Sequence, residues 1–225
     1  AMTSVSDIRL DPDRAARTGV PEIVYAPGKT VAQVGSAVSG LLEAGVSPVI
    51  AARCSPEQVA GLVADRPDVD VIGATVVARS APANDRRVVV VTAGTADQVV
   101  AAEAAATLRA FGVEVKRIND VGVAGVHRLL ERVDELRRAD ALVVIAGMEG
   151  ALPTAVAGLV DTPLVAVPTS AGYGSSFEGI TALAAMTASC APGVSVAGID
   201  NGVGAACVLV RWLRTRTAAD VVGSA

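Results

Sequence analysis

The sequence predicts an α/β protein in which helices cover both faces of a parallel sheet, preceded by a smaller α/β unit. Short runs of β-branched and small apolar residues alternate with longer amphipathic stretches. Hydrophobic residues make up 52% of the chain but aromatic residues only 2%, and small apolar side chains suit close packing of helices on a sheet. In the second part of the chain, polar and glycine-rich clusters follow the predicted strands.

The N-terminal part predicts a small α/β domain over residues 5–80. Its apolar runs predict three strands, at 22–25, 46–51 and 69–78, with helices between them. Ser55 followed by Pro56 is a typical helix start, because serine caps free N–H groups and proline suits the first helical position. The polar segment 79–87 contains a proline and is predicted to be a linker.

Residues 87–225 predict the larger domain. Its strands are expected at 87–92, 113–118, 141–146, 164–168 and 194–199. Its helices are expected at 96–111, 123–138, 152–159, 180–189 and 203–217. Regular alternation of strand and helix is typical of a three-layer, flavodoxin-like or Rossmann-like fold with a parallel sheet. Such sheets bind ligands outside the carboxyl ends of their strands, so we expect a small-molecule site there.

Charge and cysteine content exclude several other classes. The formal net charge is −4, which argues against nucleic-acid binding as the main function. The longest apolar runs, such as 141–146, are too short to cross a bilayer. The three cysteines are widely spaced and form no CxxC pair, so neither a disulfide framework nor a structural zinc site is expected. We expect a cytoplasmic protein with no nucleic-acid or membrane partner.

Two short motifs have both a functional and a structural interpretation. The segment 92–97 follows a strand and opens a helix, so it either contacts phosphate and ribose or is only a capping turn. Gly28-Lys29-Thr30 lacks the first glycine of a nucleotide-binding P-loop, which disfavours an NTPase. Lys29 either pairs with a phosphate or is a solvated lysine. His127, the single histidine, lies in a predicted helix and is more often structural there than catalytic.

Glu149 and Cys190 are the candidates for reactive groups. Glu149 follows a buried strand in a Met-Glu-Gly turn, where it is either a proton acceptor or an acid favoured by a helix N-terminus. Cys190 precedes Ala-Pro-Gly between a helix and a strand, so its loop favours exposure, whereas a buried inert thiol is the common alternative. Cys54 and Cys207 lie in apolar surroundings and are expected in the core.

The order of these clusters resembles two related families. The segment 92–97, Leu152-Pro153 and Asn201 are similar to motifs of the AIR carboxylase and N5-carboxyaminoimidazole ribonucleotide mutase (PurE) family. That family carries a histidine where this chain has 118–122, and it has no equivalent of the Cys190 segment. The whole chain more closely resembles the pyridinium-3,5-biscarboxylic acid mononucleotide synthase (LarB) family. The matching stretches are 17–22, 28–30, 92–97, 119–128, 146–153, 168–174 and 189–193.

The resemblance implies an activity and its reactants. Members of the LarB family carboxylate the pyridinium ring of nicotinic acid adenine dinucleotide with CO2 or bicarbonate and cleave its phosphoanhydride, releasing AMP. The product is a precursor of the nickel-pincer nucleotide cofactor. The resemblance also implies Mg2+ and a homo-octamer. It assigns no metal ligands, and Asp97, Asp120 and Asp200 are the acidic candidates at strand ends.

The resemblance also distributes roles among the candidate residues. Cys190 would add to the ring and Glu149 would accept a proton. The substrate-binding set comprises Thr92, Gly94, Thr95 and Asp97 for the ribose and phosphate, Ser170, Tyr173 and Gly174 for the ring, Lys29 for the AMP half, and Asp120 and Asn201. Two alternatives stay open. One is a purine-pathway carboxylase or mutase, and the other is a non-catalytic nucleotide-binding regulator.

Overall fold

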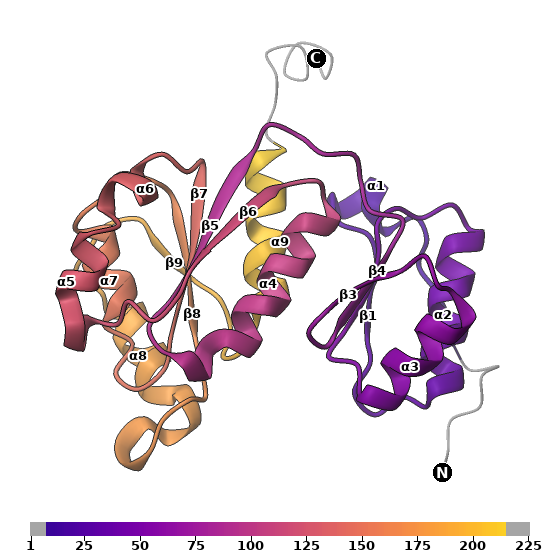
Figure 1. Cartoon of the computed structure of the whole chain (residues 1–225), viewed down its shortest axis with the longest axis horizontal. Coiled ribbons are helices and arrows are strands. Elements are labelled where there is room, and N and C mark those ends of the chain that lie inside the picture. The colour runs from indigo at the N-terminus through magenta and orange to yellow at the C-terminus, as the bar shows by residue number, and fades with distance from the viewer. Residues whose placement is uncertain (1–7, 215–225) are drawn as a thin grey trace.

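The computed structural model describes residues 8–214 and consists of two α/β units that lie side by side (Figure 1). The chain passes from the first unit to the second between β4 (Thr75–Ala78) and β5 (Arg87–Thr92). The α/β fold with a five-stranded parallel sheet confirms the predicted fold class.

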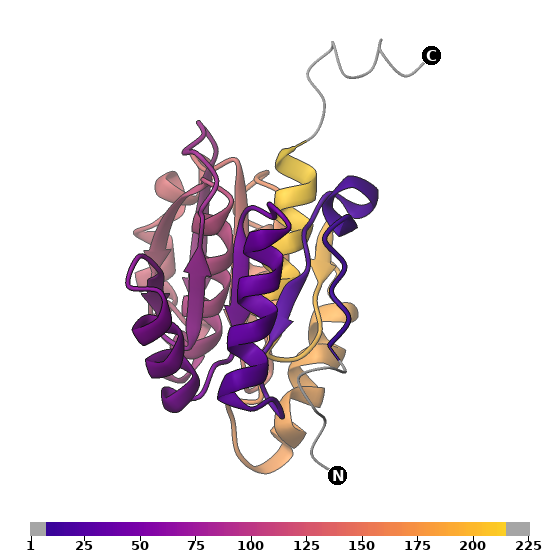
Figure 2. The same ribbon diagram turned by 90° about the vertical axis from the view of Figure 1, so that its right-hand side faces the viewer.

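The N-terminal unit is a four-stranded sheet with the order β1-β2-β4-β3. Its other elements are α1 (Arg14–Thr18), β1 (Ile23–Tyr25), α2 (Val31–Glu43), β2 (Val49–Ala52), α3 (Pro56–Asp65) and β3 (Asp70–Ile72). Strands β1 and β2 are parallel, whereas β4 is antiparallel to both of its neighbours. Helices α2 and α3 each begin at a capping box and cover the outer face of the sheet (Figure 2).

The prediction of one continuous strand over 69–78 is wrong, because this segment folds into a hairpin. Gly73 has a φ of 61°, a left-handed conformation that suits glycine and reverses the chain between β3 and β4. Asp70 pairs with Val77 and Ile72 with Thr75. The small sheet is therefore mixed, and the turn at 73–74 projects from its edge.

The larger unit has the strand order β6-β5-β7-β8-β9, and every pair is parallel. Its strands after β5 are β6 (Glu114–Ile118), β7 (Ala141–Ala146), β8 (Leu164–Pro168) and β9 (Val194–Val196). Its helices are α4 (Gln98–Ala110), α5 (Val126–Leu130), α6 (Val133–Arg137), α7 (Leu152–Ala157), α8 (Ile180–Thr187) and α9 (Gly202–Leu213), with short 3-10 segments η2 (Thr95–Asp97), η3 (Val123–Gly125) and η4 (Gly174–Gly179).

Alternate residues of the parallel strands face opposite helical layers. Val88 and Val90 of β5 pack in one core with α4 and α9, whereas Val89 and Val91 pack in a second core with α5 to α8. All four valines are fully buried. This explains why β5 reads as a continuous valine run: both of its faces are covered.

Three predicted elements differ in extent. The helix expected over 123–138 is divided into η3, α5 and α6, so that Leu129 and Leu136 are fully buried whereas Leu130 is 51% exposed. The strand expected over 194–199 ends at Val196. The last helix ends at Leu213, and the remainder of its predicted range extends beyond the described residues. No helix within residues 8–214 is both long enough and apolar enough to cross a membrane.

The layer formed by α4 and α9 joins the two units (Figure 1). Ile50 of β2 and Val77 of β4 point away from α2 and α3 and belong to the same core cluster as Val100 and Leu108 of α4. Their sequence neighbours Val49 and Val76 instead face α2 and α3. The inner face of the small sheet therefore packs on the helices that cover the large sheet.

Candidate functional site

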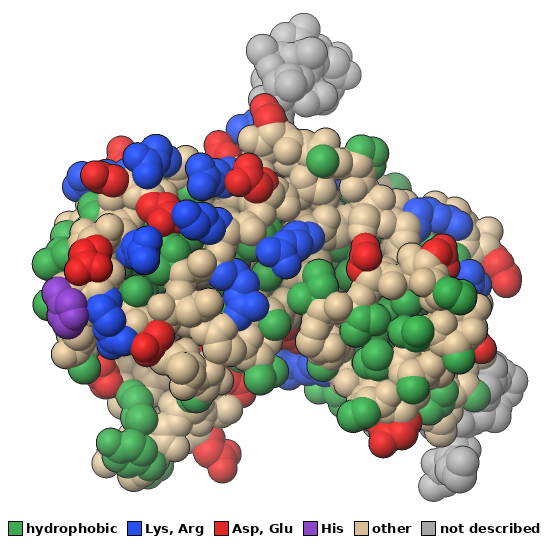
Figure 3. Space-filling model, viewed as in Figure 1, with side chains coloured by type: hydrophobic (Ala, Val, Ile, Leu, Met, Phe, Trp, Pro, Cys, Tyr) green, Lys and Arg blue, Asp and Glu red, His purple; other side chains and the backbone are tan. Residues whose placement is uncertain are grey.

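A cleft of about 950 Å³ lies between the two units at the carboxyl edge of the parallel sheet. We call it the interdomain cleft. The N-terminal unit contributes Arg53 and the turn at 73–75, and the larger unit contributes the start of α4 and the segment 169–171. The space-filling view shows the molecule hollowed between the units, with basic side-chain atoms in the hollow (Figure 3). Its volume falls in the range typical of small-molecule sites.

Asp97 stabilises the turn at 92–97, which the sequence predicted to contact phosphate. Its carboxylate accepts hydrogen bonds from the Gly94 backbone N–H at 2.8 Å and from the Thr169 hydroxyl at 2.7 Å. The side chain is buried, and burial raises the pKa of the Asp97 carboxyl, although the Thr169 and Gly94 hydrogen bonds oppose that shift. Asp97 thus ties the end of β5 to the end of β8.

Thr92 has a similar internal role. It is fully buried, and its hydroxyl oxygen accepts from Gln98 Nε2 at 3.1 Å and from the Asp120 backbone N–H at 3.2 Å. Asp120 itself is exposed and forms a 2.6 Å ion pair with Arg128, away from the interdomain cleft. Both residues therefore shape strand ends, and neither lines the cleft.

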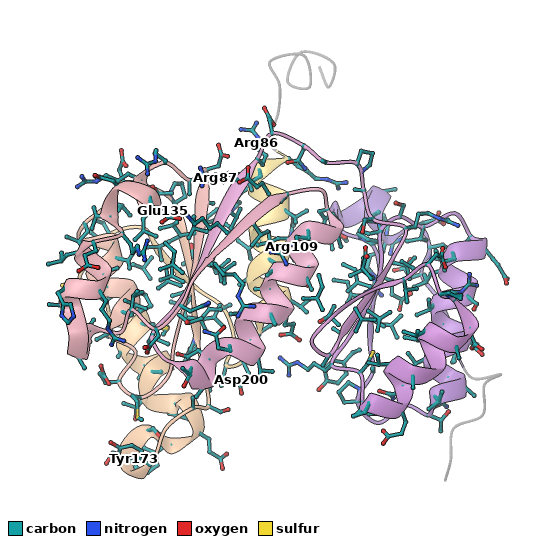
Figure 4. All side chains as sticks on the ribbon, viewed as in Figure 1. Arg86, Arg87, Arg109, Glu135, Tyr173 and Asp200 are labelled. Atoms are coloured by element: carbon teal, nitrogen blue, oxygen red, sulfur yellow. The ribbon has the colours of Figure 1, made fainter. Side chains whose placement is uncertain are left out.

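Asp200 and Ser170 meet at the edge of the interdomain cleft. The Ser170 backbone N–H donates to Asp200 Oδ1 at 2.8 Å. The Asp200 backbone carbonyl accepts from the Arg53 guanidinium. Figure 4 shows Asp200 at the lower edge of the large sheet, on the side of the N-terminal unit.

The polar residues of the cleft that the sequence motifs did not indicate include Arg53, Gln98, Glu103 and Arg117. Arg53 forms a bidentate ion pair with Glu103, at 2.8 and 3.3 Å, and Glu103 also accepts from the Gly202 backbone N–H at 3.1 Å. Arg117 donates to the side-chain oxygen of Gln98. Arg53 directly follows β2, so the strand-end rule applied to the small sheet would have found it.

Several predicted residues lie outside the interdomain cleft. Glu149 is exposed in the turn after β7, next to the 171–172 segment, because the Met148 backbone N–H donates to the Ala171 carbonyl at 2.9 Å. Tyr173 is 81% exposed at the tip of the η4 loop, with Gly174 beside it (Figure 4).

The remaining candidates are Lys29, Asn201 and Thr95, which lie outside the cleft lining. Lys29 is exposed and donates to the Tyr25 carbonyl at 2.6 Å. Asn201 caps α9 by accepting from the Gly204 backbone N–H at 2.7 Å. Thr95 is exposed in the turn that opens α4, beside Ala96 of the cleft wall.

The three free cysteines have different surroundings. Cys54 is buried and Cys207 is half-buried, and burial raises the pKa of each thiol to about 11. Cys190 is exposed. It precedes the amino end of β9, whereas Glu149 follows the carboxyl end of β7. In one chain the two residues therefore flank opposite ends of parallel strands.

The acidic candidates do not form a metal cage. Among the described residues, no group of three or more His, Cys, Asp or Glu side chains is placed to hold a metal ion. Asp97 and Asp120 already bind protein groups, and one oxygen of Asp200 accepts from Ser170. Because these residues do not fit a protein-only magnesium site, we derive no step through magnesium.

Comparisons with known proteins match both units. Residues 87–220 match the AIR carboxylase family, and residues 2–79 match the LarB/PurE-like N-terminal domain. An uncharacterized protein of Methanocaldococcus jannaschii, MJ0165, is 38% identical over 212 residues, covering 88% of this chain and 80% of that protein. The N5-carboxyaminoimidazole ribonucleotide mutase of the same organism is 37% identical over 122 residues, covering 52% of this chain and 72% of the mutase.

Among solved structures, a variant of Treponema denticola PurE2 matches with a TM-score of 0.48 and 24% identity, covering 62% of this chain and 88% of that chain. The family matches confirm the resemblance seen in the motifs. The chain belongs to the AIR carboxylase family, as a LarB-like protein related to the PurE proteins.

Proposed function

We propose that this protein carboxylates the pyridinium ring of nicotinic acid adenine dinucleotide and hydrolyses its phosphoanhydride, giving pyridinium-3,5-biscarboxylic acid mononucleotide and AMP. The observation that carries the proposal is the exposure of Cys190 in a chain of the AIR carboxylase family. An exposed thiol can add to an electron-poor ring, whereas the other two thiols are held in apolar surroundings.

The proposed chemistry makes the ring nucleophilic before carboxylation. The Cys190 thiolate adds to the ring carbon next to the nitrogen, on the side away from the carboxyl group, and an electron pair moves to the nitrogen. The neighbouring carbon then attacks CO2 as an enamine does. The Glu149 carboxylate takes the proton from that carbon, and expulsion of the thiolate restores the aromatic ring. In a separate step, water attacks the phosphoanhydride and AMP leaves.

In this proposal Cys190 and Glu149 act on one ring from two copies of the chain. The opposite placement of the two residues within a chain supports this arrangement, as does the homo-octamer implied by the family resemblance. Large apolar side chains are exposed around η4: Met148 (41%), Tyr173 (81%), Phe177 (67%) and Ile180 (55%). A cluster of this kind suits self-association. Light scattering should give the mass of eight chains.

The direct test is turnover of the dinucleotide. The protein is mixed with nicotinic acid adenine dinucleotide, isotopically labelled bicarbonate and Mg2+, and the products are separated by mass spectrometry. We expect AMP and a mononucleotide that carries one labelled carboxyl group. Absence of both products would overturn the proposed function.

Substitutions assign the two reactive residues. Cys190→Ser and Glu149→Gln should each abolish carboxylation, whereas Cys207→Ser should retain it because Cys207 is half-buried in α9. Octamers reassembled from a mixture of the two inactive variants should regain part of the activity, since some sites then combine an intact cysteine and an intact glutamate. No recovery in verified mixed octamers would place both residues in one chain.

The 37% identity to a mutase favours a second candidate, a purine-pathway carboxylase or mutase. That function predicts turnover of an aminoimidazole ribonucleotide, and it predicts that Cys190→Ser has normal activity. This chain lacks the histidine of the mutase motif, since it has Ile-Asn-Asp-Val-Gly at 118–122. Binding of nucleotides without turnover of either substrate would instead indicate a regulator.

A further inference from the structure

We propose that the interdomain cleft binds the adenosine monophosphate half of the dinucleotide, with the adenine between the two units and the phosphate on Arg117. This inference rests on the proposed function for the identity of the dinucleotide. It goes beyond that function by naming the residues that would contact the AMP half, most of which lie outside the motifs that suggested the reaction. Lys29, the residue expected for this half, lies outside the cleft lining.

The cleft has the shape of a slot with apolar walls. The turn at 73–74 forms one wall, and Ala96 of η2 with Val99 and Ala102 of α4 forms the other. A methyl group built on Gly73 would lie 3.6 Å from Ala102 Cβ, so the walls converge to van der Waals distance at one end. Small side chains on both walls leave space for a planar base, which binds apolar surfaces through its faces.

Val99 is the exposed large apolar side chain of this lining. It is 74% exposed although it lies in the first turn of α4 on the wall of the slot. A bound adenine would cover this side chain and remove its apolar surface from water. The exposure of Val99 therefore agrees with a ligand that covers this wall of the slot when it binds.

The two arginines of the cleft differ in charge balance. Arg53 is neutralised by the bidentate pair with Glu103. Arg117 contacts the neutral amide of Gln98, and within residues 8–214 it forms no ion pair. An arginine without a carboxylate partner suits a phosphate, which its planar guanidinium binds through two N–H groups. The first turn of α4 lines the same region and adds a favourable dipole.

The position of the cleft also suits the rest of the dinucleotide. Its lining continues to Ser170 and Asp200 at the carboxyl edge, and the neighbouring 171–172 segment contacts the turn that carries Glu149. An AMP half seated at α4 therefore directs the remainder of the dinucleotide toward the edge where Glu149 lies.

The test measures AMP binding by calorimetry on the full-length protein, without any turnover. Ala74→Trp fills the slot and should weaken AMP binding by about tenfold or more, the effect of losing one stacked base. The matched control is Ala32→Trp, because Ala32 is exposed on α2 outside the cleft, and it should bind AMP normally. Thermal unfolding verifies that both variants are folded.

A second pair of variants isolates the phosphate contact. Arg117→Gln should weaken binding of AMP but leave binding of adenosine unchanged, whereas the control Arg109→Gln should change neither. Arg109 is exposed on the same helix layer and donates to the Val115 carbonyl. Equal AMP affinity of the wild type, Ala74→Trp and Arg117→Gln would overturn the inference, and so would an absence of AMP binding by the wild type.

These outcomes separate the inference from the proposed function. If AMP binds the slot as expected but the dinucleotide is never carboxylated, the proposed function fails and the site stands. If the dinucleotide is carboxylated and Ala74→Trp leaves its KM unchanged, the function stands and the site is elsewhere.

Discussion

The three thiols of this chain differ in burial, and this difference predicts different reactivities. Apolar surroundings disfavour the thiolate, so the pKa of Cys54 and Cys207 rises to about 11. The thiolate is the nucleophilic form of cysteine, so near neutral pH these two side chains react slowly. Cys190 is exposed, so a reagent in solution can reach its thiol.

Thiol labelling should therefore find one fast cysteine in each chain. We expect a disulfide reagent near neutral pH to modify Cys190 rapidly and the other two thiols only on unfolding. The rapid phase should vanish in Cys190→Ser and persist in Cys207→Ser. A rapid phase in Cys190→Ser would contradict the burial of the remaining thiols.

Asp97 predicts a pH dependence of stability. Burial raises the pKa of this carboxyl in the folded chain, so the folded state binds the proton more tightly than the unfolded state does. Its contribution is greatest at low pH and is lost as the pH rises through the folded-state pKa. Compared with Asp97→Asn, the wild type should gain stability as the pH falls from about 7 to about 4.

Urea unfolding of the two proteins across this pH range measures the difference. The variant is the proper reference because asparagine keeps an acceptor for Thr169 or Gly94 but does not titrate. A difference that moved in favour of Asp97→Asn on acidification would mean that the hydrogen bonds outweigh burial.

At the level of elements, two loops at the carboxyl edge of the large sheet pack backbone against backbone. Gly147 follows β7, and a methyl group built there would lie 2.1 Å from the Ala171 carbonyl oxygen. Neither backbone can yield without moving the segment that carries Ser170. Glycine at this position is therefore required by the packing of two loops.

Gly147→Ala should lower the free energy of unfolding by about 2 kcal/mol or more, because it overpacks two backbones. Gly158→Ala is the matched control, since its nearest neighbours lie at 3.6 Å and it ends α7 in a helical conformation. It should leave stability unchanged or raise it by about 0.5 kcal/mol. Equal losses in both variants would contradict the close approach at Gly147.

For the whole molecule, the packing of α4 and α9 between two sheets makes the two units depend on each other. The shared core cluster crosses the boundary, and the Arg53–Glu103 pair lies at the same boundary. Glu103 is 8% exposed, whereas Arg53 is 39% exposed, so water screens the pair in part. The pair also aligns Asp200 with the interdomain cleft through the Arg53 contact.

Glu103→Ala should destabilise the protein by about 1–2 kcal/mol, because it removes the carboxylate partner of Arg53 and one of the two acceptors of the Gly202 N–H, which keeps only the Asp200 carbonyl. Glu114→Ala removes an exposed partner of Arg87 and should change stability by less than about 0.5 kcal/mol. Chemical unfolding followed by circular dichroism measures both. A loss no larger than that of Glu114→Ala would show that the pair contributes little to joining the units.

The sequence predicted which residues would lie near the ends of strands, and many candidates are there. Ser170 lines the cleft, and Asp97 stabilises the neighbouring strand ends through its hydrogen bond with Thr169. Thr92 instead forms hydrogen bonds inside the protein. Arg117 was not predicted as a site residue, because it lies within β6 and the candidates were chosen among residues that follow strands. A strand pattern shows that a residue is partly exposed but not which neighbour it meets.

The alternation of elements, the two covered faces of the large sheet and the motifs of the family could all be predicted from the sequence. These features depend on local periodicity, which a linear sequence contains directly. The three-dimensional structure was needed to show that 69–78 is a hairpin and that the two units enclose a cleft lined by Arg53 and Arg117. The hairpin is a local turn at Gly73 that a hydrophobic pattern alone does not separate from a longer strand, whereas the cleft depends on packing between segments that are distant in the chain, which no local pattern records.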